Sequence, residues 1–366
     1  MKDETKQSRI RQFFRRLRQW IVSHRVASLA IGGSILVLIA AGITFALLSQ
    51  KMPEIEHYTP TPIAKIDDKP LYYSPLTGLA VSSEAETKMP VTAIMIENSP
   101  DARPQSGLKK SGIVYEAIAE GGITRFLTLH QQDKPQLIGP VRSLRMYYVD
   151  WLAPYNASVA HIGGSAAALK EVRSGKYRDI DQFFNSAYYW RSTDRYAPHN
   201  VYTSFKKLDA LNKAKGYKTS TFTGFSRTDE KPAEKVTANS VTINFSGPLF
   251  NTSYKYDKKN NRYTRYIAGA PHKDREDGTI TPKVVIAMKV SMQRVFEDGY
   301  REAIKTTGSG EAIIFQNGTA QKVKWYKASR ASQITFTDSK GVDVPLARGQ
   351  TWIAAVPTSG GGVSWK

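Results

Sequence analysis

The sequence predicts an α/β or α+β domain followed by a mostly-β domain, with one transmembrane helix ahead of both. Three observations lead to this fold class. Residues 26–50 carry no charge and follow a basic N-terminal segment. Strand-like and helical segments alternate up to about residue 218, and hairpin signals dominate after it. The chain has no cysteine, which removes disulfides, thiol nucleophiles and an acylated N-terminal cysteine.

The N-terminal 50 residues predict a membrane anchor. Residues 1–25 are basic, and residues 26–50 are long and apolar enough to cross a bilayer as a helix. The positive-inside rule puts residues 1–25 in the cytoplasm, along the anionic inner leaflet, and the remaining chain outside. A cleaved signal peptide is the alternative, but its apolar region would be shorter and followed by a small-x-small site. We therefore expect an uncleaved single-pass helix with the membrane as a partner.

The following segments are assigned from composition and periodicity. Residues 51–70 contain four prolines and predict an extended linker. Residues 71–218 predict an α/β domain that holds a ligand site. Residues 219–238 predict a second linker, and residues 239–366 predict a mostly-β domain with hairpins at "NN" (260–261) and "NG" (317–318).

The charge balance favours an anionic partner. The net charge is +20, and residues 29–366 alone hold 44 Lys and Arg against 30 Asp and Glu. Such an excess suits an anionic envelope polymer, an acidic glycan or nucleic acid, although no motif supports nucleic acid. A generally basic, soluble surface is the simpler interpretation. No cofactor and no metal site is predicted, because "HKDRED" at 272–277 is typical of a charged turn.

The stretch "HIGGSAAALKEV" (161–172) is the strongest local signal. Gly163 and Gly164 allow a sharp turn from a strand into a helix, and Ser165 is a good N-cap. The junction then predicts either a capped helix only, an anion site at the helix start, or a Ser165 nucleophile with His161 or His199 as its base. The nucleophile elbow would place a glycine two residues after the serine, and this chain lacks it.

Two further clusters surround that junction. In "GPVRSLR", Arg142 and Arg145 are three residues apart and are expected near a helix start on one of its faces, where they bind an anion or pair with Glu97, Glu116 or Glu120. A hairpin around "GG" (121–122) is expected to place Glu116, Glu120 and Arg125 on one sheet face, suited to acid–base chemistry or to solvent. The loop "YYWRSTDRYAPHNVY" supplies further candidates, which are Trp190, Arg191, His199 and Asn200. Arginines with aromatics suit sugar or base stacking and anion pairing, although a buried aromatic loop has the same composition.

Several stretches together resemble the YerB-like family of bacterial extracytoplasmic lipoproteins. They are "AIMIENSPDARPQSGL", "VYEAIAEGGITRF", "IGPVRSLR", "HIGGS", "WRSTDRYAPHNVYTS", "GSGEAIIFQNG" and "GVDVPLARGQTWIAAVP". The resemblance implies a two-part extracytoplasmic protein and no established activity. The residues that match its motifs are Glu97, Asn98, Arg103, Gln105, Glu116, Glu120, Arg125, Arg142, Arg145, His161, Ser165, Arg191, His199 and Asn200. This chain differs at its start, where a membrane helix replaces the lipidated cysteine.

The prediction for function is a membrane-anchored ectodomain that binds an anionic envelope or extracellular ligand. The expected ligand-binding residues are Arg125, Arg142, Arg145, Gly163, Gly164, Ser165, Trp190, Arg191, His199 and Asn200. One alternative is an envelope hydrolase or transferase acting on glycan or acyl groups through Ser165, His199, Glu116 or Glu120. The other is a structural or interaction protein without a small ligand.

Overall fold

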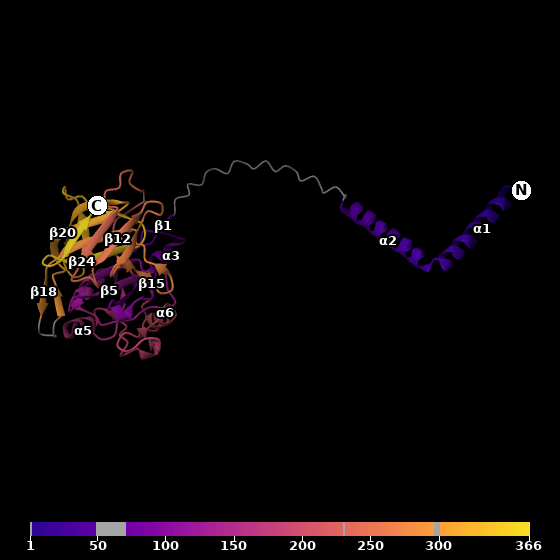
Figure 1. Ribbon diagram of the computed structural model, residues 1–366. Helices are drawn as coiled ribbons and strands as arrows, with labels where there is room; N and C mark the ends of the chain where they lie inside the picture. Colours follow the sequence, from indigo (N-terminus) through magenta and orange to yellow (C-terminus); the bar gives the residue numbers. More distant parts are fainter. Residues whose placement is uncertain (1, 49–70, 230, 296–300) are drawn as a thin grey trace. The chain divides into compact units, whose positions relative to one another are not determined.

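The computed structural model describes residues 2–48, 71–229, 231–295 and 301–366, and divides the chain into two compact units, residues 1–68 and 69–366. The first unit holds α1 (Lys2–Ser23) and α2 (Arg25–Leu48). Residues 25–45 of α2 are long and apolar enough to span a membrane, so the expected apolar helix is present (Figure 1). The expected linker at 51–70 lies outside the described residues.

The second unit is built on a twelve-stranded sheet that runs through both expected domains. Its main path, in spatial order, is β22 (Thr335–Thr337), β21 (Thr319–Lys327), β20 (Gly308–Gln316), β17 (Val284–Val290), β24 (Thr351–Pro357), β4 (Ile113–Glu120), β5 (Ile123–His130), β3 (Thr92–Glu97), β6 (Ser158–Ala160) and β7 (Arg178–Asp179). The strands β18 (Met292–Val295) and β19 (Arg301–Ile304) pair with each other, and β19 touches β4. Strand β24 pairs in parallel with β4, so backbone hydrogen bonds join the two sequence segments.

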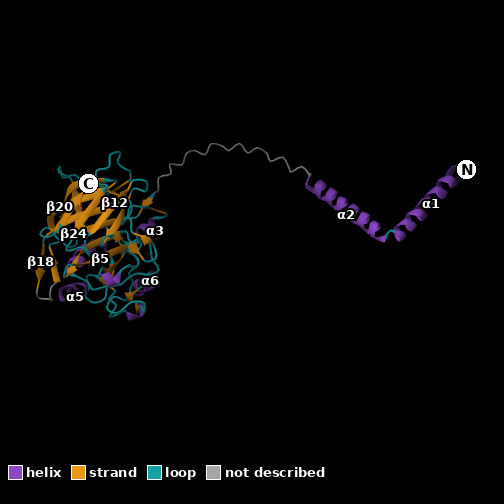
Figure 2. Cartoon of the chain, in the orientation of Figure 1, coloured by secondary structure: helices purple, strands orange, loops and turns teal. Residues whose placement is uncertain are grey.

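Figure 2 shows the helices of this unit beside the N-terminal half of the sheet. Those that pack on its faces are α4 (Met146–Leu152), α5 (Ala166–Val172) and α6 (Phe205–Ala214), whereas α3 (Glu84–Thr87) has no buried residue. One face packs against α4 and α5 around the stacked rings of Tyr115 and Trp151, and the opposite face packs against α6 through Phe205 and Leu208. Alternating strand residues face the two cores, because successive side chains point to opposite faces. This is the expected α/β architecture.

The C-terminal segment is rich in strands, as predicted, and no described residue after α6 is helical. A five-stranded sheet packs on the large sheet, with the order β14 (Ala270–Pro271), β13 (Arg262–Ile267), β12 (Thr252–Asp257), β11 (Ser240–Asn244) and β25 (Gly362–Trp365). The hairpins at 260–261 and 317–318 are confirmed, and Asn261 and Asn317 have φ of 50° and 55°, which the turns require.

Four two-stranded pairings complete the unit. They are β1 (Tyr72–Tyr73) with β2 (Ala80–Val81), β8 (Trp190–Arg191) with β9 (Val201–Tyr202), β10 (Arg227–Thr228) with β23 (Leu346–Ala347), and β15 (Lys273–Asp274) with β16 (Gly278–Thr279). Strand β10 lies within the segment expected as a linker, residues 219–238. Arg227 there donates to backbone oxygens of Leu76 and Ala347, so this segment ties both halves of the unit together.

The predicted two-glycine turn between β4 and β5 is present, but the expected sharing of one face is wrong. The register shifts between Ile118 and Glu120, so that Arg125 pairs with Ala117 instead of Ile118. A bulge of one extra residue turns the following side chains to the other face. The side chains of Glu116 and Glu120 therefore lie on opposite faces of the sheet, and only that of Glu120 shares a face with Arg125.

Candidate functional site

The "HIGGS" stretch links β6 to α5, and its glycines are required by close packing. A side chain at Gly164 would approach the carbonyl oxygen of Leu144 to 2.9 Å, and Gly163 has φ of 63° and packs against Phe183. Ser165 accepts a hydrogen bond from the backbone N–H of Ala168 and caps α5, as predicted. The junction is explained by turn geometry and capping.

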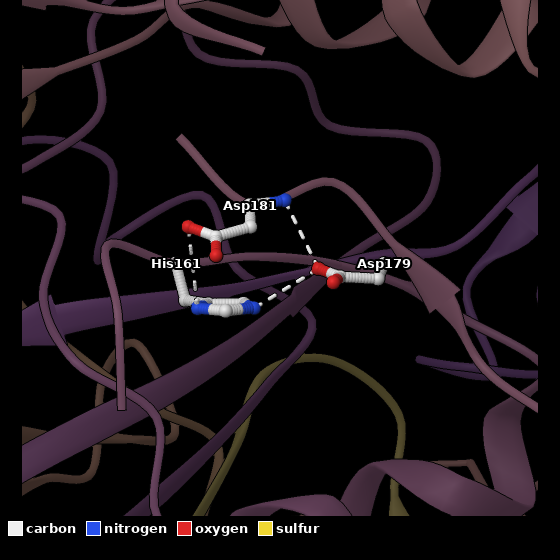
Figure 3. Close-up of side chains that lie close together, drawn as sticks. All are labelled: His161, Asp179 and Asp181. Carbon is white, nitrogen blue, oxygen red and sulfur yellow. Dashed lines mark hydrogen bonds and ion pairs between the residues drawn. The ribbon is translucent and has the colours of Figure 1, made fainter. Parts of the chain in front are cut away.

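His161 closes a small internal charge cluster with Arg173, Asp179 and Asp181 (Figure 3). Its Nε2 lies 3.0 Å from Asp179 Oδ1, and its Nδ1 lies 2.8 Å from the carbonyl oxygen of Gly163. Both partners are hydrogen-bond acceptors, so each contact uses a proton on the histidine nitrogen that faces it.

The geometry of His161, Asp179 and Asp181 would also admit a metal ion, since ligand atoms of the three lie within 4.8 Å of one another. Their oxygens, however, already have donors. Asp181 Oδ2 lies 2.5 Å from Arg173 Nη2, and Asp181 Oδ1 accepts from the N–H of Phe183. The arrangement suits an internal ion-pair cluster that orders the loops after β6 and β7.

Ser165 does not form a hydrogen bond with a histidine within the described part of the chain. His161 is engaged as above, and His199 lies instead at the carboxyl end of β3. There the His199 Nδ1 atom is 2.9 Å from Glu97 Oε2 and 3.1 Å from Ser99 Oγ. Ser99 Oγ and Glu97 Oε2 thus face the same histidine nitrogen, whereas Ser165 has no histidine within hydrogen-bond distance among the described residues.

Glu97 also holds an arginine. Arg142 Nε lies 3.1 Å from Glu97 Oε1, and the carboxylate is thus shared between Arg142 and His199. The side chain of Glu97 is 5% exposed, whereas those of Arg142 and His199 are 23% and 22% exposed. Glu97, Ser99, Arg142 and His199 are called the Glu97 cluster below.

The neighbouring Glu120 cluster consists of Glu120, Arg125 and Arg145. Both arginines donate to Glu120 at 2.6 Å, and Arg125 also donates to the carbonyl oxygen of Ser143. The arginine side chains are only 2% and 6% exposed. Burial raises the pKa of Glu120, but the two arginines lower it more, and the net shift is downward. Among the alternatives for Arg142 and Arg145, pairing with Glu97 and Glu120 is the one observed.

The expectation that Arg142 and Arg145 share a helix face is wrong. The helix α4 begins only at Met146, and Arg145 is its N-cap residue with extended backbone. Arg142 lies in an extended segment whose N–H donates to Met95, and the next bridge joins Leu144 to Gly164. The backbone of residues 141–144 is tied to β3 and to the loop after β6, so it cannot join the helix.

The predicted aromatic loop lies beside the Glu97 cluster. Strand β8 pairs with β9, which directly follows His199 and Asn200. Arg191 donates to Asn200 Oδ1 at 2.7 Å, and Trp190 is 36% exposed. The sequence reasoning did not single out the exposed ring of Tyr196 in this loop, or those of Phe183 and Phe184 shortly before it. Two consecutive phenylalanines before a polar turn are a weak signal for them.

Glu116 lies on the other side of the sheet, in a buried polar network that sequence reasoning missed. Its carboxylate accepts from Arg265 and from Trp352 Nε1 at 2.9 Å each. Arg265 Nε donates to His272 Nδ1, and His272 Nε2 donates to Gln105 Oε1. Burial and the nearby arginines hold the pKa of His272 well below its usual range, in keeping with a neutral imidazole. These five residues are called the Glu116 network.

The charged turn expected at 272–277 is therefore only partly exposed. Asp274 is buried, and its Oδ1 accepts from the N–H groups of Glu276 and Asp277, whereas Asp277 pairs with Lys110. His272 belongs to the Glu116 network instead. No signal in a single sequence links His272 to Gln105, because the two lie far apart along the chain.

Comparison with known proteins gives a consistent result. The N-terminal domain model of the family described as "Protein of unknown function (DUF3048)" matches residues 76–218, and the C-terminal domain model matches residues 241–353. The chain is 35% identical over 289 residues to the "Putative lipoprotein YerB" of Bacillus subtilis (strain 168), covering 78% of this chain and 86% of the relative.

A crystal structure of the YerB protein from Bacillus subtilis has the same fold, with a TM-score of 0.71 and 31% identity. The match covers 80% of this chain and 99% of the crystallised chain. Both matched segments, in order, and the shared fold lead to one conclusion: this chain belongs to the YerB-like DUF3048 family, whose function is not known.

Proposed function

We propose that this chain is a membrane-anchored extracytoplasmic protein that binds an anionic cell-envelope polymer at the Glu97 cluster. The anchor is supported by the apolar helix α2 and by the similarity to a protein described as a lipoprotein. The basic residues before α2 favour a cytoplasmic N-terminus and external C-terminal domains.

The binding proposal is carried by Arg142. Its Nε is buried in an ion pair 3.1 Å from Glu97 Oε1 that lacks hydrogen-bond geometry, and its two terminal nitrogens have no hydrogen-bond partner among the described residues. The side chain is 23% exposed, so these donors are open to solvent. A guanidinium held by its Nε presents two parallel N–H donors, which suits a phosphate or carboxylate group.

The surroundings of Arg142 extend the proposed site. His199 shares Glu97 with it, and the exposed ring of Trp190 and the guanidinium of Arg191 lie on the strand paired with β9. An exposed aromatic ring and cations suit a polymer that carries sugars and anionic groups. Arg125 and Arg145 are left out of the proposed site, because both are buried against Glu120.

The test uses the full chain in detergent micelles with three immobilised probes, which are poly(glycerol phosphate) teichoic acid, a neutral glucan and a single-stranded oligonucleotide. Arg142→Gln is expected to weaken teichoic acid binding about tenfold or more, since a charge-assisted hydrogen bond contributes roughly 1.5–3 kcal/mol. Lys259→Gln removes the same charge from the exposed β12–β13 turn and serves as the matched control.

Equal losses from both variants would show a general charge effect and remove the proposed site. Oligonucleotide binding as tight as teichoic acid binding, at the same salt concentration, would contradict specificity for an envelope polymer. Binding of the neutral glucan would contradict the anionic selectivity.

A further inference from the structure

Strand β25 lies at the edge of the five-stranded sheet and leaves one of its long sides unpaired. Ser240 and Lys366, at the start of its ladder with β11, exchange two backbone hydrogen bonds of 2.9 and 3.0 Å. In an antiparallel ladder such pairs alternate with pairs that exchange none. Val363 and Trp365 occupy the second kind of pair, so their N–H and C=O groups point away from β11. Neither has a backbone partner among the described residues.

A groove of about 610 Å³ runs along this free side, near the C-terminus labelled in Figure 1. Its apolar part is formed by Ile313, Val356, Val363 and Trp365. The Trp365 ring packs edge-on against Phe315 of the large sheet and remains 36% exposed. The groove thus offers an apolar floor directly beside unpaired backbone groups.

The rim of the groove is basic. Lys289 pairs with Glu311 at 3.0 Å, whereas Lys322 and Lys324 are exposed on β21 and have no ion-pair partner among the described residues. Asp338 also lines the groove, but its Oδ1 already accepts two backbone N–H groups within its own turn. Three lysines against two carboxylates leave a positive rim.

We propose that this groove binds an extended peptide segment with apolar and acidic side chains, which adds to β25 as a further strand. Main-chain hydrogen bonds along an open edge give affinity, and pockets for alternate side chains give specificity. Exposed edges are commonly blunted by proline, lysine or a bulge; residues 362–365 contain none of these, and a lysine, Lys366, stands only at the end of this ladder. The unpaired donors and acceptors favour a peptide over a glycan, because a glycan has no matching backbone repeat.

The test measures fluorescence anisotropy of a labelled eight-residue peptide of alternating valine and glutamate, with blocked ends, added to the full chain in detergent micelles. The alternating valine–lysine peptide is expected to bind at least tenfold more weakly. Two further peptides carry N-methyl groups on alternate residues, so that each blocks one edge of the strand. Only one of these two is expected to lose binding, since only one edge pairs with β25.

Two variants locate the binding on the protein. The double variant Lys322→Glu/Lys324→Glu is expected to weaken binding at least tenfold, and Lys259→Glu is its control on an exposed turn that does not line the groove. Val363→Pro removes an outward N–H without removing a hydrogen bond to β11, and is also expected to abolish binding. If Val363→Pro unfolds, the double lysine variant still shows whether the peptide binds at this groove.

Binding that is unchanged in the double lysine variant overturns the proposal. Equal binding of the two N-methylated peptides, or of the valine–lysine peptide, overturns it as well. Retention of an anionic oligosaccharide, with no binding of the valine–glutamate peptide, would assign the groove to a glycan instead.

Discussion

The Glu116 network and the Glu97 cluster are built from the same residue types, but they differ in exposure and in hydrogen-bond completeness. In the network, Glu116 and Arg265 are fully buried, and the carboxylate has donors from Arg265, Thr124 and Trp352. In the cluster, Arg142 and His199 are about one-fifth exposed, and Arg142 retains free donors among the described residues.

The difference separates a structural role from the proposed binding role. The Glu116 network connects β4 and Gln105 of the N-terminal family segment with β13, His272 and Trp352 of the C-terminal segment, so its charges hold the two segments together. The Glu97 cluster contacts residues of the N-terminal segment and presents charge to solvent. The Glu120 cluster lies between these extremes, because its arginines are buried but Glu120 is 31% exposed.

The largest expected effect is on the most buried pair. Glu116→Gln leaves the guanidinium of Arg265 buried without its counter-charge, and we expect a loss of about 3–5 kcal/mol in the free energy of unfolding. Urea unfolding of the full chain in micelles measures this loss. Glu311→Gln, in the exposed pair with Lys289, is the control and should leave the free energy of unfolding nearly unchanged. Similar losses in the two variants would show that burial does not distinguish these pairs.

A smaller loss in the free energy of unfolding is expected when the Glu120 cluster is changed, and this loss depends on pH. The folded-state pKa of Glu120 is lowered, so the stability it contributes is fully present above its ordinary value of 4.5 and is lost as pH falls through the folded pKa. Glu120→Gln should cost about 1–3 kcal/mol at pH 7 and less at pH 3, because the carboxyl of the unfolded chain is then protonated and the stabilisation by the ionised carboxylate declines. A difference between the two proteins that stays constant from pH 7 to pH 3 would contradict this account.

Sequence patterns predicted the parts of the fold that depend on local chemistry. The apolar helix, the hairpins at 260–261 and 317–318 and the Ser165 cap each follow from a few adjacent residues. The bulge before Glu120 was missed, since one extra residue in a strand leaves the apolar pattern almost unchanged. Arg142 and Arg145 were placed on one helix, because spacing does not show that residues 141–144 pair with β3 and the loop after β6.

The candidate site was predicted as a set of residues but not as an arrangement. Pairing of Arg142 with Glu97 and of Arg145 with Glu120 was among the stated alternatives. The division into a buried Glu120 cluster and a partly exposed Glu97 cluster was not predicted, since burial depends on which strands become neighbours. The Glu116 network needs contacts between residues more than 100 positions apart, and a single sequence carries no signal for them.

The smallest expected effect concerns Arg142, and it sharpens the contrast with Arg145. Arg142→Gln removes a partly exposed ion pair, and Glu97 keeps His199 as a hydrogen-bond partner, so we expect a loss of about 0–1 kcal/mol in the free energy of unfolding. Arg145→Gln removes a buried donor from Glu120 and should cost more, about 1–3 kcal/mol. Urea unfolding of both variants, in the same micelles, makes the comparison. If Arg142→Gln proves as destabilising as Arg145→Gln, Arg142 is an internal structural cation, and the proposed binding site loses the residue on which it rests.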